Sequence, residues 1–468
     1  MKQSEGFRDE LSTIGKDGKR VWVYPKKIAG KYFNFRQIFS YSLLAFLFLA
    51  PHIKMKGNPI LLFNLLERKF IVFGKIFWPQ DFYLFALSMI GAVIFVSLFT
   101  VVFGRLFCGW ACPQTIFMEM VFRRIEYAIE GDWTKQKKLN KGKWDGTKIF
   151  KKVLKHSIFW LISFLIANTF LAYIIGADKL IEIQFDNPMN HLGGLTTIIV
   201  FSTVFYGVFA FLREQVCTTI CPYGRLQGVL LDSKSINVAY DYKRGEGEKG
   251  RAKFRKNEDR AELGKGDCID CKQCVHVCPT GIDIRNGTQL ECVNCTACMD
   301  ACDFIMESVG LEKGLIGYIS EEGIETGEKG IQWNTRVFAY SGVLALILSV
   351  LVYLTITRSN YDFVITRLQG TTFNRIDKQN YSNSYNLILL NKTKDVGEIS
   401  LKILEGKATI PPMTFVLEPE VETHKNFALM MSKVDYKESG NNPKIIIGIY
   451  KNGELVAKEK TLFMGPSF

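Results

Sequence analysis

The sequence has no cysteine outside four short motifs, and its 468 residues include only five histidines. None of the 12 cysteines lies beyond Cys302, so residues 358–468 contain none. Cysteines gathered in this way are typical of ligands or redox groups in a reducing compartment, and not of a secreted disulfide framework. The histidines are scattered singly, which is weak evidence for a binding site, so we assign no role to His52 or His191.

Charged side chains are absent from five long apolar segments, residues 37–53, 82–104, 157–177, 192–212 and 337–357. A helix of roughly 20 apolar residues crosses the ~30 Å hydrocarbon core of a bilayer, and only the first segment is clearly shorter than that. We therefore predict an α-helical bundle of about five transmembrane helices. The first 36 residues are polar and basic and contain no apolar core, so no cleavable signal peptide is expected.

Basic residues are distributed unevenly among the predicted loops. Residues 1–36 carry nine Lys and Arg, residues 105–155 carry twelve and residues 213–336 carry seventeen, whereas residues 178–191 carry only one. Because loops rich in Lys and Arg stay in the cytoplasm, we predict a multi-pass protein of the cell inner membrane with a cytoplasmic N-terminus and a periplasmic C-terminus. The formal net charge of +13 then reflects topology and contact with anionic membrane lipid, and predicts no nucleic-acid partner.

Two of the cysteine motifs have the spacing of a bacterial ferredoxin. Each reads C-x-x-C-x-x-C-x-x-x-C, a run that holds [4Fe–4S] clusters, and its fourth cysteine binds the cluster of the other motif. The first predicted cluster therefore has the ligands Cys268, Cys271, Cys274 and Cys302. The second has the ligands Cys292, Cys295, Cys298 and Cys278. Zinc is the alternative, but zinc sites favour two separated pairs over a tight triple, and His276 is interpreted as a surface residue because eight thiols complete both sites.

The other two motifs are matched C-x-x-x-C-P pairs at the cytoplasmic ends of predicted helices, Cys108 and Cys112 after the second and Cys217 and Cys221 after the fourth. A spacing of four places two thiols on one face of a continuing helix, and the proline suits the first turn of a new one. Two matched hairpins would bring the pairs together as one four-thiol, candidate catalytic site. Soft thiolates bind Cu(I), zinc or an iron–sulfur cluster, and a metal-free redox dithiol is also compatible with the pattern.

Beyond the fifth apolar segment the sequence alternates as short strands do. Strands are predicted at residues 386–390, 398–404, 414–417, 427–434 and 444–450, and Asn452-Gly453 predicts a type I′ turn leading to residues 454–463. Strands at this spacing over about 100 residues suit an all-β immunoglobulin-like sandwich. Because this part has no cysteine or histidine cluster, we expect it to contact partners and to carry no chemistry.

These elements predict a multi-domain membrane protein with six parts in chain order: a cytoplasmic segment (1–36), a four-helix membrane domain (37–242), a charged linker (243–266), a two-cluster ferredoxin (267–336), a fifth transmembrane helix (337–357) and a periplasmic β-sandwich (358–468). The linker is rich in Lys, Arg, Glu and Gly, which predicts a flexible segment.

This order of motifs resembles the FixG/RdxA/CcoG family of accessory proteins for cbb3-type cytochrome c oxidase. Local strings agree with the resemblance: F-W-P-Q-D-F-Y at residues 77–83, Y-D-Y-K-R-G-E at residues 240–246 and G-D-C-I-D-C at residues 266–271. The resemblance covers nearly the whole chain. It departs at Asp303, where a proline often follows the last cysteine, and this bears on cluster potential more than on cluster binding.

The resemblance implies an oxidoreductase that reduces Cu(II) to Cu(I) for the oxidase copper site. Since soft thiolates stabilise Cu(I), we expect copper to be handled at Cys108, Cys112, Cys217 and Cys221. The implied partners are oxidase assembly factors or copper chaperones and transporters, with a cytoplasmic or quinol electron donor. The sequence does not choose between a monomer and a homodimer.

Two alternatives are open. The chain could be a ferredoxin-type relay subunit that takes electrons from quinol for a partner reductase, or a scaffold for oxidase assembly with no redox role. The outer sandwich favours the reductase, because the simpler relay subunits lack such a domain.

Overall fold

The computed structural model describes residues 12–15, 17, 19–55, 57–64, 69–78, 81–255, 258–260, 262–328, 330, 334–368, 370, 372–377, 379–392, 396–419 and 422–466. The chain divides into two compact units. The first unit comprises Met1–Lys75 and Asp81–Leu351, and the second comprises Ile76–Gln80 and Val352–Phe468.

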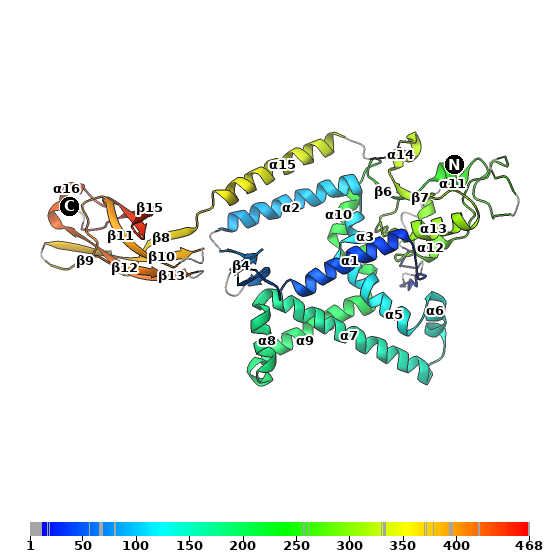
Figure 1. Cartoon of the computed structure of the whole chain (residues 1–468), viewed down its shortest axis with the longest axis horizontal. Helices are drawn as coiled ribbons and strands as arrows, with labels where there is room; N and C mark the ends of the chain where they lie inside the picture. The colour runs from blue at the N-terminus through cyan, green and yellow to red at the C-terminus, as the bar shows by residue number, and fades with distance from the viewer. Residues whose placement is uncertain are drawn as a thin grey trace. The chain divides into compact units, whose positions relative to one another are not determined.

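Four helices of the described chain are long and apolar enough to cross a membrane: α2 (Phe82–Phe103), α7 (Gly146–Ile175), the span Pro188–Leu212, and α15 (Thr335–Ile356). The third of these consists of η4 (Pro188–His191), α9 (Leu192–Gly207) and η5 (Val208–Leu212). α7 packs against α9 (Figure 1). Hydroxyls within these helices donate to the carbonyl four residues earlier, as Ser163 does to Phe159, so they are satisfied without water.

The first predicted span lies in α1 (Lys31–Leu49), which is not among these four helices. The start of α1 is tied to the ferredoxin, because the carboxylate of Asp300 accepts the backbone N–H groups of Tyr32 and Phe33 at 3.1 and 2.7 Å. Arg36 is buried one turn later. The other four predicted apolar helices are confirmed, and a membrane crossing by α1 stays a prediction.

Short elements connect α1 to α2 and α7 to α9. After α1 come β1 (Lys54–Met55), β2 (Asn58–Pro59), β3 (Leu61–Asn64), β4 (Lys69–Val72) and β5 (Lys75–Phe77), and α8 (Ala177–Phe185) follows α7. β3 pairs with β4 as an antiparallel hairpin, and β3 packs against α7.

Short helices follow two of the long ones, α2 and the span that ends in η5. They are α3 (Leu106–Trp110), α4 (Pro113–Ile116), η3 (Phe117–Phe122), α5 (Arg123–Ile129), α6 (Trp133–Lys141), η6 (Val216–Ile220) and α10 (Pro222–Leu230). η3, η5 and η6 are π-helices, a rare form that is frequent at functional sites. Phe122 of η3 stacks on Phe209 of η5 at 4.7 Å between ring centroids, and both belong to one apolar core with Phe159 of α7.

The ferredoxin region contains β6 (Asn237–Tyr240), α11 (Tyr242–Glu246), α12 (Gln273–His276), η7 (Ile284–Asn286), α13 (Ala297–Ser308), β7 (Ile316–Ile319) and α14 (Glu321–Thr326). β6 pairs with β7 in antiparallel fashion. The predicted flexible linker is fastened at two points of its described part. Arg260 is buried and donates to the carbonyl of Gly266 at 2.9 Å, and Arg244 pairs with Asp267 at 2.6 Å.

The second unit is a sandwich of two four-stranded sheets (Figure 1). Its elements are β8 (Tyr361–Arg367), β9 (Asn374–Arg375), β10 (Asn380–Asn391), β11 (Gly397–Glu405), β12 (Thr414–Leu417), β13 (Glu422–Ser432), α16 (Lys433–Ser439), β14 (Lys444–Lys451) and β15 (Glu454–Leu462). One sheet has the order β13-β10-β8, with β9 also paired to β10, and the other has the order β12-β11-β14-β15.

Alternating residues of both sheets form the sandwich core, including the fully buried Leu387, Ile399 and Ile447. All the predicted strands are present, and β8 and β9 were not predicted. Asn452 and Gly453 both have positive φ, 49° and 91°, as a type I′ turn requires.

Candidate functional site

The second predicted ligand set lines one small cavity of the ferredoxin. Its wall includes Cys278, Cys292, Cys295 and Cys298, together with Cys274 of the first predicted set. Cys278 belongs to the first motif in sequence but lies with the three cysteines of the second. This is the arrangement that a crossover of ligands between the motifs predicts.

The first predicted set is gathered by the packing of α12 against α13. Cys302 lies on α13 with the thiols of Cys274, Cys268 and Cys271 as neighbours. Burial raises the pKa of the Cys302 thiol most, and these neighbouring thiols raise it further. These neighbours of Cys302 are the ones that a crossover of ligands predicts for the first set.

The two cysteine loops share one backbone conformation. In the first loop Asp270 and Lys272, on either side of the middle cysteine, have φ of 54° and 57°. In the second loop Asn294 and Thr296 occupy the same positions with φ of 51° and 65°. Left-handed residues turn successive N–H groups toward one concave side, an arrangement found at iron–sulfur sites. The motif spacing predicts the ligands but gives no signal for this backbone, which is unusual for Lys and Thr.

Backbone N–H groups point at the thiols of the second set. Cys278 accepts hydrogen bonds from the N–H groups of Thr280, Ile282 and Gly281, and burial raises the pKa of its thiol above the usual value. Burial likewise raises the pKa of Cys295 to about 11. Buried thiols with N–H donors in these numbers fit the donor set of a [4Fe–4S] cluster, and ligation would displace their protons.

The two C-x-x-x-C-P motifs begin with the same backbone turn. Gly104, four residues before Cys108, has φ 55° and ψ −132°. Arg213, four residues before Cys217, has φ 53° and ψ −122°. This region of φ and ψ is strained for any residue except glycine, so the repeat imposes its geometry on Arg213.

The second cysteine of each motif is the N-cap of a new helix. Cys112 precedes Pro113 of α4 with φ −64° and ψ 124°, and Cys221 precedes Pro222 of α10 with φ −66° and ψ 114°. The spacing of four would place both thiols on one helix face only if the helix continued through the motif, and it does not. The long helices end before the first cysteine, because the left-handed residue breaks them.

The four membrane-proximal thiols lie close to one another. Burial raises the pKa of Cys217 to about 12, and the thiols of Cys112, Cys108 and Cys221 add to this effect. Burial also raises the pKa of Cys108 to about 11, opposed by the cation of Arg105. Among the residues that the structure describes, no group of three or more His, Cys, Asp or Glu surrounds a position for a single ion. The same holds for the eight ferredoxin cysteines, and the four membrane-proximal thiols are neighbours of one another.

Side chains brace one motif against the other. Arg105 of the first motif donates to Oε1 of Gln227 at 2.9 Å and to the carbonyl of Gly224 at 3.2 Å, both on α10. The thiol of Cys108 donates to the same Gln227 oxygen at 3.2 Å. In return, Gln114 donates to the carbonyl of Arg213 at 3.4 Å. These buried bonds fix the distance between the two pairs.

The first thiol motif touches the second ferredoxin loop directly. A Cβ placed on Gly109 would overlap the carbonyl oxygen of Val293 and lie 2.7 Å from that of Asn294. Buried Arg36 donates to the carbonyl of Gly109 at 2.7 Å and to that of Cys295 at 3.5 Å. Sequence analysis missed both residues. A glycine between Cys108 and Cys112 was the available signal for close packing, and Arg36 gave none.

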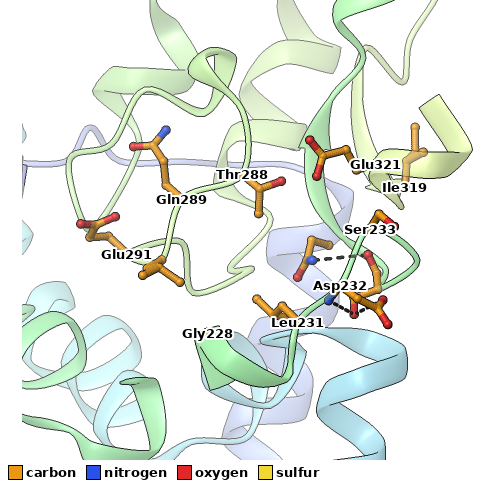
Figure 2. A pocket seen from close by; sticks show the side chains of 12 residues that line it. Gly228, Leu231, Asp232, Ser233, Thr288, Gln289, Glu291, Ile319 and Glu321 are labelled. Carbon is orange, nitrogen blue, oxygen red and sulfur yellow. Dashed lines mark hydrogen bonds between the residues drawn. The ribbon is translucent and has the colours of Figure 1, made fainter. Parts of the chain in front are cut away.

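A polar cavity of about 370 Å³ opens beside the same loop. Figure 2 shows Thr288, Gln289 and Glu291 on one side of it and Asp232 with Glu321 on another. Asp232 accepts hydrogen bonds from Ser235 and the backbone of Lys234. The carboxylates of Asp232 and Glu321 therefore share this cavity with Glu291, the residue that precedes Cys292.

Family models match three parts of the chain. A 4Fe-4S dicluster domain matches residues 212–321, and a 4Fe-4S binding domain matches residues 85–138, which include Cys108 and Cys112. The IG-like fold at the C-terminal of FixG matches residues 351–466. Iron–sulfur binding and the C-terminal domain type are thus supported independently of the motif spacing.

Curated relatives extend the match to most of the chain. RdxA of Cereibacter sphaeroides is 33% identical over 407 residues, which are 84% of this chain and 84% of RdxA. The chain belongs to the FixG/RdxA family. FixG of Rhizobium meliloti is 37% identical over 307 residues, covering 64% of this chain and 57% of FixG. The ferredoxin-type protein NapH of Haemophilus influenzae is 23% identical over 235 residues, covering 46% of this chain and 66% of NapH.

The family resemblance seen in the motifs is confirmed by these matches. With its four apolar helices and its ferredoxin domain, this FixG/RdxA protein is a membrane-associated iron–sulfur electron-transfer protein.

Proposed function

We propose that this FixG/RdxA protein reduces Cu(II) to Cu(I) at the four-thiol site, with electrons delivered through the ferredoxin, in support of the assembly of a cbb3-type cytochrome c oxidase. Bound at the eight ferredoxin cysteines, [4Fe–4S] clusters supply one-electron carriers. The observation that carries the proposal is the contact of Gly109 with the Val293–Asn294 backbone. It leaves no room for solvent or a side chain between the membrane thiol motif and the loop of the second ligand set.

The chemistry of the four thiols suits copper as a substrate. Soft thiolates favour Cu(I) over Cu(II), so their ligation raises the copper potential and makes a one-electron reduction more favourable. The thiols act as ligands and release their protons when copper binds. A site that passes its ion on does not need a closed cage, and four adjacent thiols offer several two-thiol positions.

The test is a double substitution, Cys217→Ser with Cys221→Ser, in protein that has been reduced with dithionite and desalted anaerobically. We expect Cu(II) reduction, followed with a Cu(I)-specific chelator, to slow at least roughly tenfold because hard hydroxyls replace soft ligands. The iron content and the low-temperature EPR signals should stay unchanged. Thr219→Ser, inside the same motif, is the matched control. Cu(II) reduction at the wild-type rate in the double variant would show that copper is reduced at another site and would contradict the proposal.

The assembly role is assigned to the second unit. Its sandwich has no cysteine and one histidine, His424, so it offers a protein-binding surface and no redox group. A chain that ends after residue 357 should keep Cu(II) reduction and fail to restore oxidase activity in a strain that lacks the protein. Full restoration by the shortened chain would contradict a docking role for the sandwich.

A second candidate function is a relay that feeds a partner reductase. The similarity to the ferredoxin-type protein NapH, which covers 46% of this chain, favours it. The two functions differ in the test above, because a relay predicts that any Cu(II) reduction is independent of Cys217 and Cys221.

A further inference from the structure

A cavity of about 360 Å³ lies at the inner end of α7, where the long helices meet the short ones. Its wall combines aromatic rings with buried ion pairs, and includes Trp22, Tyr24, His156 and Phe211. No motif of the sequence pointed to it. Its size suits a single substituted ring and not a larger cofactor.

Flat rings form the apolar part of this wall. His156 of α7 stacks on Phe211 of η5 with ring centroids 6.1 Å apart and planes 14° apart. Trp22 lies under the guanidinium of Arg20 at 4.0 Å, and that of Arg213 is 5.7 Å from its centroid. Trp22 and Phe211 remain 40% and 52% exposed. Faces of this kind bind a planar ring, and they lie at the end of the membrane helices where a lipid-soluble ligand would present its head group.

Buried ion pairs form the polar part of the wall. Arg213 binds Glu126 through two hydrogen bonds of 3.0 and 2.9 Å. Glu130 pairs with Lys152 at 2.8 Å and with Lys155 at 2.9 Å. The paired lysines offer further N–H donors to oxygen atoms on a bound ring.

A histidine that can take up a proton completes the cavity. Nδ1 of His156 lies 2.9 Å from the hydroxyl of Tyr206, a bond that fixes the orientation of the imidazole. In the tautomer in which Nδ1–H donates to the Tyr206 hydroxyl, Nε2 is unprotonated and can accept a proton from a ligand hydroxyl. The polar cavity shown in Figure 2 differs, because no aromatic or histidine side chain is among the residues that line it.

Two connections join this cavity to the redox centres. Arg213 also lines a second, smaller cavity. The wall of that cavity includes Cys217 of the thiol site and Thr280 of the ferredoxin. The chain that carries Trp22 and Tyr24 continues to Lys26, whose N–H donates to the carbonyl of His276 at 2.8 Å. His276 lies between Cys274 and Cys278 in sequence, so Arg213 links the cavity to the thiol site and residues 22–26 link it to the ferredoxin.

We propose that the cavity binds the head group of a membrane quinol and that electrons enter the protein there. The inference rests on the proposed electron-transfer function and names its donor. Oxidation of one quinol to quinone breaks two O–H bonds and releases two electrons and two protons. The electrons match the two one-electron carriers that the eight ferredoxin cysteines would hold. The protons pass through His156 to water on the side where the ferredoxin lies.

Binding is tested with the full chain in lipid nanodiscs and a short-chain quinone, decylubiquinone or a menaquinone analogue, by equilibrium dialysis. We expect one quinone per chain, and at least a tenfold weaker affinity in His156→Phe, which keeps the ring stack and removes both nitrogens. Trp22→Leu, at the exposed edge of the cavity, should weaken binding similarly even if the first variant folds poorly. Tyr173→Phe is the control, since its hydroxyl lies on the same helix but donates to the carbonyl of Leu47. No binding to the wild type, or equal affinity in all variants, overturns the proposal.

A second measurement separates this inference from the proposed function. Anaerobic addition of the short-chain quinol should bleach the iron–sulfur absorbance of the wild type and of the Cys217→Ser, Cys221→Ser variant alike. The Cu(II) assay uses dithionite-reduced protein and needs no quinol. Wild-type Cu(II) reduction in the double variant, with intact bleaching, would refute only the thiol site. Absent bleaching, with Cu(II) reduction that still depends on Cys217 and Cys221, would refute only the quinol site.

Discussion

At the scale of single residues, one glycine and one arginine decide how closely the thiol motif packs against the ferredoxin. Gly109 lies against the backbone of the second cysteine loop, and Arg36 ties both backbones together from α1. Neither residue carries redox chemistry. Each controls the separation of two sites that are distant in sequence, so each should affect transfer between them more than the content of either site.

Gly109→Ala is expected to push the thiol motif away from the Val293–Asn294 loop, because the added methyl meets backbone atoms that cannot rotate away. Overpacking of this kind costs about 1–3 kcal/mol of stability. Thermal unfolding should show that loss, and Cu(II) reduction by pre-reduced protein should slow while iron content is retained. Gly193→Ala, where a Cβ would meet nothing within 4 Å, is the control. Unchanged rates in Gly109→Ala would show that this contact does not govern transfer.

Cys278→Ser tests the crossover of ligands. It should disrupt the set formed with Cys292, Cys295 and Cys298 and spare the set that contains Cys302, because the thiol of Cys278 is a neighbour of those three thiols. Anaerobic protein should contain about eight iron atoms per chain in the wild type and about half in the variant. Cys302→Ser should remove the opposite EPR signal. Loss of the same signal in both variants would contradict the crossover.

At the scale of elements, buried ion pairs hold α5 against α7. The carboxylate of Glu130, just beyond α5, is 3% exposed and pairs with Lys152 and Lys155. Burial alone would raise the pKa of Glu130, and the two lysines outweigh it, so that its pKa lies below the usual value. The pair therefore stabilises the fold above the unfolded pKa of about 4.3, and this contribution is lost as the pH falls through the lower folded pKa.

Glu130→Gln should destabilise the protein by about 3 kcal/mol at pH 7, because two lysines lose their partner in a buried place. The gap between wild type and variant should narrow as the pH falls below about 4.3, where Glu130 of the unfolded chain takes up a proton, and should close below the lower folded pKa. Thermal unfolding in detergent at several pH values measures both effects. Glu307→Gln, which breaks an exposed pair with Lys313, should change little. A gap that does not depend on pH would contradict this account of Glu130.

At the scale of the whole molecule, loop charge predicts on which side of the membrane each part lies. Alkaline phosphatase fused after Phe468 should be active in intact cells, because the segments rich in Lys and Arg keep the N-terminus and the ferredoxin in the cytoplasm. A cytoplasmic reporter at the same place should be silent. The opposite pattern would mean an even number of spans, and α1 would be the first helix to exclude, since it is the one apolar helix predicted to span that does not meet the length and composition of a span.

Local properties of the sequence were enough to predict the ferredoxin domain, four apolar helices, the strands from β10 onward and the family. The spacing of the cysteines, the length of the apolar segments and the alternation of apolar and polar residues can all be read without knowledge of distant residues. The tertiary structure alone decided which backbone Gly109 contacts, to which carbonyls Arg36 donates hydrogen bonds and that His156 lines a cavity. Those facts depend on partners far away in the chain, and a lone glycine, arginine or histidine looks the same in sequence whether or not it meets them.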